Sequence, residues 1–282
     1  MLPTGKFADD LLFMTVRLVS LNNVATGFIF KTPKGNNVVV SNKHFVMDGS
    51  LPAPEKPIVQ KVEMTFHLDD DTNTSFSGNV SWYIHPTEDL AFFQLSEIEK
   101  YINEQESPKK VVYKEISSGM IPSEEDLKNL TALEEVVMVG YPDGCFDAKN
   151  NLPLLRYGRT ASHPNVDFNN TKRGLIDVFC VPGSSGSPVF LYNELHASVK
   201  DYVAELGPRN VLLGIEVSMP VTWKDVRQKV KDPVLGKYLI VGNNQPITIC
   251  TDYVYQDDIG MGFYIKASEL AGFYPQFDSI GI

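Results

Sequence analysis

The sequence predicts an all-β fold, and three observations support that prediction. Short runs in which apolar and polar residues partly alternate recur along the chain, as expected for half-buried strands. Turn residues separate these runs, because 20 glycines and 18 prolines are scattered along the chain rather than clustered. The length of 282 residues suits one large all-β domain or two smaller ones.

The first half of the chain supplies one set of expected strands. They cover residues 11–20, 25–31, 38–41, 58–67, 76–84 and 90–95. The sequence Lys34-Gly35-Asn36-Asn37 separates the second strand from the third and is typical of a hairpin turn.

The middle of the chain is less regular and predicts helices over 97–105 and 123–134, with a short strand over 110–113. Ser123 begins a capping-box pattern that ends at Asp126. Further strands are expected over 135–140, 154–162, 175–181, 189–191, 211–217 and 260–268, with a short helix at 268–271. We therefore divide the chain into residues 1–115, a helical connection at 116–135, and residues 136–282.

Composition excludes several classes of protein. The net charge is −10 and no basic stripe with interleaved aromatic residues is present, which argues against nucleic-acid binding. No apolar run reaches the length of a membrane-spanning helix, so no membrane association is expected. The odd cysteine count (Cys145, Cys180 and Cys250) argues against a disulfide framework, and the N-terminus lacks a signal pattern. We expect a cytoplasmic protein.

The stretch Pro182-Gly183-Ser184-Ser185-Gly186-Ser187-Pro188 is a tight turn of small residues between two apolar runs. A nucleophilic serine needs such a turn, because its hydroxyl must stand clear and nearby N–H groups must converge on an oxyanion. The turn resembles the Gly-x-Ser-Gly-Gly/Ser-Pro motif of the trypsin-like, chymotrypsin-fold serine proteases. The resemblance implies that Ser185 is the nucleophile and that the N–H groups of Gly183 and Ser185 form the oxyanion hole. A plain glycine-serine loop is the alternative.

A second motif lies at the end of the third expected strand. The segments Thr26-Gly27-Phe28-Ile29 and Val40-Ser41-Asn42-Lys43-His44, joined by a hairpin, resemble the strand pair that leads to the catalytic histidine of this family. The resemblance implies that His44 is the general base. The alternative is a hydrogen-bonded loop histidine without a catalytic role.

A third motif, Asp89-Leu90-Ala91, precedes an apolar strand and resembles the segment that carries the aspartate of the family's triad. A carboxylate there can accept the Nδ1–H of the histidine and stabilise the imidazolium. Glu88 and Asp48 are rival carboxylates, and His85 is a nearby second histidine. The order His44, Asp89, Ser185 is that of chymotrypsin-type enzymes.

The resemblance extends over roughly residues 10–272. It implies two six-stranded antiparallel β-barrels with a few short helices and the active site between them. The N-terminal barrel (1–115) would carry His44 and Asp89, and the C-terminal barrel (136–282) would carry Ser185. The activity implied is that of a serine endopeptidase acting on polypeptides through an acyl-enzyme, with no cofactor and no metal.

The same resemblance implies a pocket for the substrate side chain. Its base would be Phe179, and its walls would be formed by Val217, Ser218, Met219 and Gly262. This composition favours small or medium apolar side chains. Strand alternation predicts that Glu216 points away from the pocket, and core packing is the alternative role for Phe179.

Other functions remain open. The domain could be catalytically silent and serve as a binding module, or its activity could be gated by an unknown activating partner. Ser184 and Ser187 are rival nucleophiles. For Cys145 and Cys180 we expect buried apolar roles rather than thiol catalysis. Asp69, Asp70 and Asp71 lack the ligand spacing of a calcium loop and predict a solvated turn.

Overall fold

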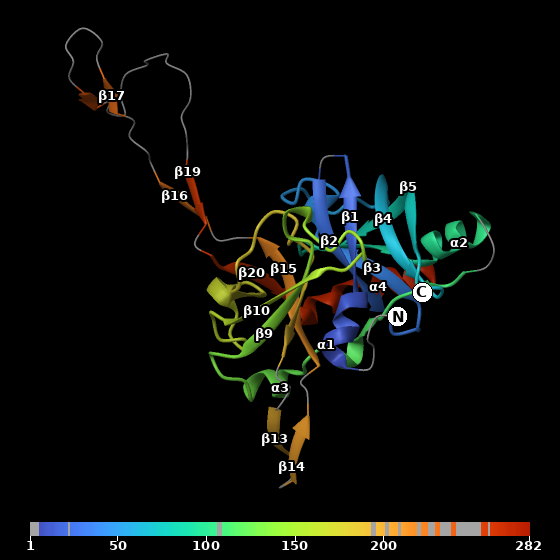
Figure 1. The fold of residues 1–282 in the computed structure, drawn as a ribbon. Coiled ribbons are helices and arrows are strands. Elements are labelled where there is room, and N and C mark those ends of the chain that lie inside the picture. The colour runs from blue at the N-terminus through green and yellow to red at the C-terminus, as the bar shows by residue number, and fades with distance from the viewer. Residues whose placement is uncertain are drawn as a thin grey trace.

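The computed structural model describes residues 6–21, 23–105, 109–192, 196–200, 203–207, 210–218, 221–224, 229–231, 238–240, 255–258 and 260–282. Two six-stranded antiparallel β-barrels with a few short helices form its body (Figure 1), which confirms the predicted fold class.

The N-terminal barrel follows the strand order β1-β2-β3-β6-β5-β4 and closes where Val19 on β1 pairs with Glu63 on β4. Its strands are β1 (Thr15–Ser20), β2 (Asn23–Lys31), β3 (Asn37–Ser41), β4 (Ile58–Leu68), β5 (Asn73–Ile84) and β6 (Ala91–Gln94), with β7 (Val111–Val112) and β8 (Ile116–Ser117) paired outside the ring. Alternation explains the long strand β4, because Val62, Met64 and Phe66 are buried at every second position.

The C-terminal barrel is closed in the order β10-β11-β20-β15-β12-β9. Its strands are β9 (Glu135–Gly140), β10 (Leu154–Thr160), β11 (Arg173–Asp177), β12 (Pro188–Leu191), β15 (Val211–Ser218) and β20 (Gly262–Lys266). Three two-stranded ladders lie outside the barrels, all within the part of the chain between β12 and β20 (Figure 1): β13 (His196–Lys200) with β14 (Val203–Gly207), β16 (Val221–Lys224) with β19 (Tyr255–Asp258), and β17 (Lys229–Lys231) with β18 (Tyr238–Ile240).

The helices are short. They are α1 (Phe7–Asp10), α2 (Ser96–Gln105), α3 (Glu124–Lys128) and α4 (Tyr274–Ile280), with 3₁₀ turns η1 (Leu11–Phe13), η2 (Lys43–Phe45), η3 (Ser118–Met120), η4 (Pro142–Gly144), η5 (Phe168–Asn170) and η6 (Ala267–Phe273). The strand expected over 11–20 begins at Thr15, because η1 takes up its first residues.

The helix expected over 123–134 ends six residues early. Its start is as predicted, since the Ser123 hydroxyl accepts a hydrogen bond from the backbone N–H of Asp126 in a capping box. The helix stops at Lys128, and beyond it the backbone N–H of Thr131 donates to the Glu134 carboxylate. Such a local side-chain bond offers the backbone an alternative to the helix.

Three hydrophobic clusters organise the core. One fills the N-terminal barrel and another fills the C-terminal barrel. The third joins the two barrels, because Phe28 and Phe92 from the first and Phe190 and Ile265 from the second belong to it. This shared core fixes the relative position of loops that come from both barrels.

The C-terminal helix α4 ties the end of the chain to the N-terminal barrel. The ring of Phe277 lies 4.8 Å from that of Phe92 on β6, and Phe277 is 1% exposed. We predict that Phe277→Ala lowers the free energy of unfolding by about 3–5 kcal/mol, through lost burial and the cavity left behind. Urea denaturation measures this change. Leu133→Ala is the control, because Leu133 is 60% exposed; an equal effect of the two substitutions would contradict the packing described here.

Candidate active site

His44 and Asp89 form a hydrogen-bonded pair at the edge of the N-terminal barrel. The His44 Nδ1 lies 2.8 Å from Asp89 Oδ2, and the His44 backbone N–H donates to Asp89 Oδ1 at 2.9 Å. Strands β3 and β6 bring the two residues together, since Ser41 pairs with Ala91 and each site residue lies just beyond its strand. Asn42 also donates its side-chain N–H to the Asp89 carbonyl at 2.9 Å. Both sides of the pair are therefore fixed by the sheet.

The electrostatics of the pair favour an imidazolium next to a carboxylate. Burial lowers the pKa of His44, but the hydrogen bond and charge of Asp89, together with the charge of Glu216, raise it above its usual value. Burial raises the pKa of Asp89, yet the bonds to His44 hold it below its usual value. The arrangement can hold a histidine in one tautomer and stabilise its protonated form.

One of the rival acids, Asp48, and the second histidine, His85, make contacts outside the His44–Asp89 pair. Asp48 is exposed and accepts hydrogen bonds from the backbone N–H and hydroxyl of Ser50. His85 is buried, its Nδ1 accepts from the Glu88 backbone N–H at 2.9 Å, and its Nε2 lies 3.0 Å from the Glu269 carbonyl. Both sets of contacts are local or structural.

Of the three serines in the turn, Ser185 differs from its neighbours. The Ser184 hydroxyl accepts hydrogen bonds from Arg156 and the Val181 N–H, and the Ser187 hydroxyl donates to Thr26 at 3.2 Å. Ser184 and Ser187 are fully buried, whereas Ser185 is half-buried. Within the described ranges the Ser185 hydroxyl makes no hydrogen bond, to His44 or to any other residue. It is the hydroxyl left free for chemistry.

Backbone hydrogen bonds anchor the turn on both sides of Ser185, and its carbonyl groups make several of them. Each carbonyl of residues 182–185 accepts a hydrogen bond: Pro182 from Asp143 N–H (2.6 Å), Gly183 from the Thr26 hydroxyl (3.0 Å), Ser184 from Ser187 N–H (2.9 Å) and Ser185 from Thr26 N–H (2.9 Å). Among the described residues, the N–H groups of Gly183 and Ser185 have no acceptor. Two free donors within one anchored turn are suited to an oxyanion.

Glycine is required at two positions of this turn. Gly183 and Gly186 both have φ of +86°, a region that favours glycine. A Cβ at Gly183 would lie 2.6 Å from the Tyr141 carbonyl oxygen, and one at Gly186 would overlap the Thr26 carbonyl. The motif glycines are thus explained by close backbone approach.

The predicted pocket residues are only partly described. Phe179 is 62% exposed, so core packing is not its role. Val217 is buried in the core that joins the barrels, and a Cβ at Gly262 would overlap the sulfur of Cys180. Ser218 ends β15, with its side chain outside the described part, and Met219 lies outside the described residues. The pocket assignment stays a prediction.

Two charged residues that were not predicted as site residues, Arg156 and Glu216, contact the turn. Glu216, which was expected to point away from the pocket, is 1% exposed and lies beside Cys180 inside the C-terminal barrel, and its direction relative to the pocket stays a prediction. Burial raises the pKa of Glu216 to about 7. Arg156 approaches from β10 and donates to the Phe179 carbonyl and to the Ser184 hydroxyl, each at 2.9 Å. The sequence feature that could have indicated a buried Glu216 is its position as the lone charged residue within the apolar run Val211–Val217.

The two described cysteines differ from each other. Cys180 is 1% exposed, and burial raises the pKa of its thiol above the usual range, which confirms the expected buried role. The same expectation is wrong for Cys145, which is exposed in the segment after η4. Cys250 lies outside the described residues.

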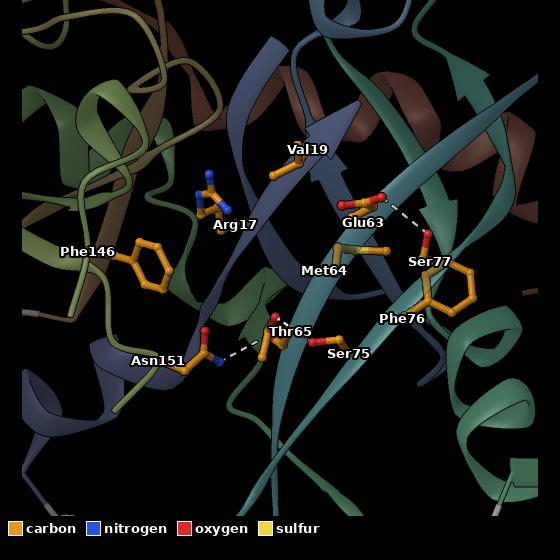
Figure 2. Close-up of a pocket in the computed structure, with 10 residues that line it drawn as sticks. All are labelled: Arg17, Val19, Glu63, Met64, Thr65, Ser75, Phe76, Ser77, Phe146 and Asn151. Atoms are coloured by element: carbon orange, nitrogen blue, oxygen red, sulfur yellow. Dashed lines mark hydrogen bonds between the residues drawn. The ribbon is translucent and has the colours of Figure 1, made fainter. Parts of the chain in front are cut away.

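Away from the His44–Asp89 pair and the Ser185 turn, the described part of the chain has one notable feature, a pocket on the N-terminal barrel. In the described part of the chain, no three His, Cys, Asp or Glu residues are grouped so as to hold a metal ion, and no helix is long and apolar enough to cross a membrane. A pocket of about 220 Å³ lies on the outside of the N-terminal barrel (Figure 2), lined by Arg17, Val19, Glu63, Met64, Thr65, Ser75, Phe76, Ser77, Phe146 and Asn151. None of these is a predicted site residue.

Solved structures similar to this one include several proteases. One is Rv3671c from M. tuberculosis H37Rv, a serine-to-alanine mutant in its inactive form (TM-score 0.47, 16% identity, covering 96% of this chain and 89% of that chain). Another is the HtrA-type protease AlgW with a tripeptide (TM-score 0.49, 11% identity, covering 97% of this chain and 63% of that chain). A third is the scabies mite inactivated protease paralogue S-I1 (TM-score 0.48, 13% identity, covering 96% of this chain and 97% of that chain).

A comparison with curated proteins gave no match. A family model for the trypsin-like peptidase domain matches residues 25–195, the segment that contains His44, Asp89 and Ser185. Because this match covers more than half of the chain, the protein belongs to the trypsin-like peptidase domain family.

Proposed function

We propose that this protein is a serine endopeptidase that hydrolyses polypeptides through Ser185, His44 and Asp89. The observation that carries the proposal is the His44–Asp89 pair, joined at 2.8 Å, together with an anchored turn whose Ser185 hydroxyl is free. Family membership supports a protease, and the geometry supports these three residues as its catalytic group.

In the proposed mechanism, His44 removes the proton of the Ser185 hydroxyl as the oxygen attacks a peptide carbonyl. Asp89 holds the Nδ1–H of His44 and stabilises the imidazolium that forms. The imidazolium then gives its proton to the leaving amine, and water resolves the acyl-enzyme by the reverse sequence.

The N–H groups of Gly183 and Ser185 would receive the oxyanion of each tetrahedral intermediate. One such donor contributes about 3 kcal/mol to transition-state stabilisation in a protease of this kind of chemistry. The absence of a hydrogen bond between His44 and Ser185 is compatible with this role, since catalytic hydrogen bonds are often long before substrate binds.

The experiment combines a peptide-library digest, read by mass spectrometry, with a fluorophosphonate that labels activated serines. We expect cleavage of library peptides and a single label on the tryptic peptide that contains Ser185. A protein that is folded but neither cleaves nor reacts under any condition would instead be the silent binding module that the sequence left open. Reaction only after addition of a partner would identify gating.

A further inference from the structure

Arg156 is a charged side chain that reaches into the C-terminal barrel from β10. Its strand neighbours Leu155 and Tyr157 are 43% and 58% exposed, so alternation directs Arg156 inward. Its Nη1 donates to the Phe179 carbonyl and to the Ser184 hydroxyl, both at 2.9 Å. One nitrogen thus bridges the segment that enters the turn and the residue that immediately precedes Ser185.

The hydrogen bond from Arg156 to Ser184 restrains the centre of the turn. It stands between Gly183 and Ser185, whose N–H groups are the free donors. The peptide bond from Ser184 to Ser185 carries one of those N–H groups, so the position of Ser184 sets its direction. The Ser184 hydroxyl also accepts the Val181 N–H at 3.2 Å, which joins the Arg156 contact to the backbone of the turn.

Glu216 provides the buried charge that accompanies Arg156. Burial lowers the pKa of Arg156, and the negative charge of Glu216 opposes that shift. The Nε and Nη2 of Arg156 and the Oε2 of Glu216 are buried without a hydrogen-bond partner among the described residues. The backbone of Glu216 also holds the turn from its other side, accepting the Gly186 N–H and donating to the Ser187 carbonyl, both at 2.9 Å.

We infer that Arg156, with Glu216 as its buried counter-charge, is the positioning residue that keeps the oxyanion donors of Gly183 and Ser185 in place. This inference rests on the proposed function. It adds a statement about regulation: the charge that sets the turn belongs to the C-terminal barrel itself. The side chain that holds Ser184 therefore comes from this chain's own β10, and it acts beside the Thr26 contacts that come from β2 of the N-terminal barrel.

The test compares Arg156→Met and Arg156→Lys with the unmodified protein, using a cleaved peptide from the library and its aldehyde analogue. The aldehyde forms a tetrahedral adduct that uses the oxyanion donors, whereas an uncleavable peptide of the same sequence does not. We expect Arg156→Met to lower kcat and aldehyde affinity together by about 10²-fold, as for loss of one oxyanion donor, with the affinity for the uncleavable peptide retained. Arg156→Lys should restore part of the loss.

Two further variants complete the design. Arg159→Met is the matched control, because Arg159 is on the same strand but half-exposed and paired with Glu135 at 3.8 Å. Ser184→Ala removes the acceptor without burying a new group, and it serves if Arg156→Met does not fold. The losses of kcat and aldehyde affinity from Ser184→Ala and Arg156→Met should not add in the double variant, since both substitutions remove the same hydrogen bond between Arg156 and Ser184. Wild-type kcat and aldehyde affinity in folded Arg156→Met, or in Ser184→Ala, would overturn the inference.

The role of Glu216 as counter-charge is tested separately with Glu216→Gln, which keeps the shape of the side chain and removes its charge. Arg156, Cys180, His44 and Asp89 are the charged or titratable groups near Glu216. Well below pH 7 the Glu216 carboxyl is itself protonated, so we expect the two proteins to bind the aldehyde equally. Well above pH 7 the variant should bind it more weakly, and equal binding there would exclude Glu216 from the account.

The outcomes separate this inference from the function beneath it. Failure of the unmodified protein to cleave any peptide or to react with the fluorophosphonate would reject the proposed endopeptidase. An active protein whose Arg156 variants behave like the unmodified one would reject only the positioning role.

Discussion

Ser185→Ala is expected to abolish peptide hydrolysis, lowering kcat by about 10⁶-fold, as removal of the nucleophile does in a serine protease. The physical reason is that no other described hydroxyl in the turn is free. Those of Ser184 and Ser187 are fully buried and already hydrogen-bonded. Hydrolysis of the library peptide, followed under single-turnover conditions, measures the loss, and the fluorophosphonate label should disappear with it.

Ser185→Ala is a small change, so a loss of hydrolysis can be assigned to the missing hydroxyl. Alanine at position 185 removes one oxygen and keeps the backbone N–H, so the variant should fold and still bind substrate. Ser77→Ala is the control, because Ser77 lies on β5 of the other barrel and contacts Glu63. Full hydrolysis by Ser185→Ala would transfer the role of nucleophile to Ser184 or Ser187.

Asp89→Asn should lower kcat by about 10⁴-fold, because an amide at this position favours the wrong tautomer of the histidine. The structure adds a prediction for pH. The hydrogen bond and charge of Asp89 raise the pKa of His44, so removing the charge lowers that pKa. Since the neutral imidazole is the active base, the acid limb of the kcat/KM profile should move to lower pH.

Asp48→Asn is the matched control for this experiment. Asp48 is only four residues from His44, but its carboxylate is exposed and engaged by Ser50. We expect Asp48→Asn to leave both kcat and the pH profile unchanged. A loss with Asp48→Asn as large as with Asp89→Asn would show that Asp89 is not the partner on which His44 depends.

The sequence predicted the fold and the His44–Asp89 pair for reasons that are local. His44 follows one short apolar strand and Asp89 precedes another, and the antiparallel pairing of these strands, β3 and β6, brings the two ends together. The turn around Ser185 was also predictable, since positive φ at Gly183 and Gly186 demands glycine. These features depend on strand ends and turn chemistry rather than on register.

The faces on which some side chains lie could not be predicted from the sequence, because they depend on the register of strand pairing in the C-terminal barrel. Simple alternation along β15 did not predict the burial of Glu216, and the pairing of β15 with β20 shifts between Glu216 and Ser218. A second shift lies between Val189 and Phe190 in the pairing of β12 with β15. Such irregularities change the faces on which side chains lie, and barrel closure then decides which of them meet. The contact of Arg156 with Ser184 depends on the same closure.

The exposed position of Cys145 and the early end of α3 have the same origin on a smaller scale. In both places the expectation followed residue type, whereas the local turns after η4 and after Lys128 decided the outcome. Turns of this kind are set by individual hydrogen bonds, for example that between Thr131 and Glu134.

The most direct test of the catalytic assignment is a crystal structure of the protein with a peptide aldehyde derived from a cleaved sequence. We predict a covalent bond from the aldehyde carbon to Ser185 Oγ, with the new oxygen within hydrogen-bond distance of the Gly183 and Ser185 nitrogens and His44 Nε2 next to the adduct. An aldehyde bound elsewhere, or an adduct whose oxygen meets neither nitrogen, would contradict the assignment.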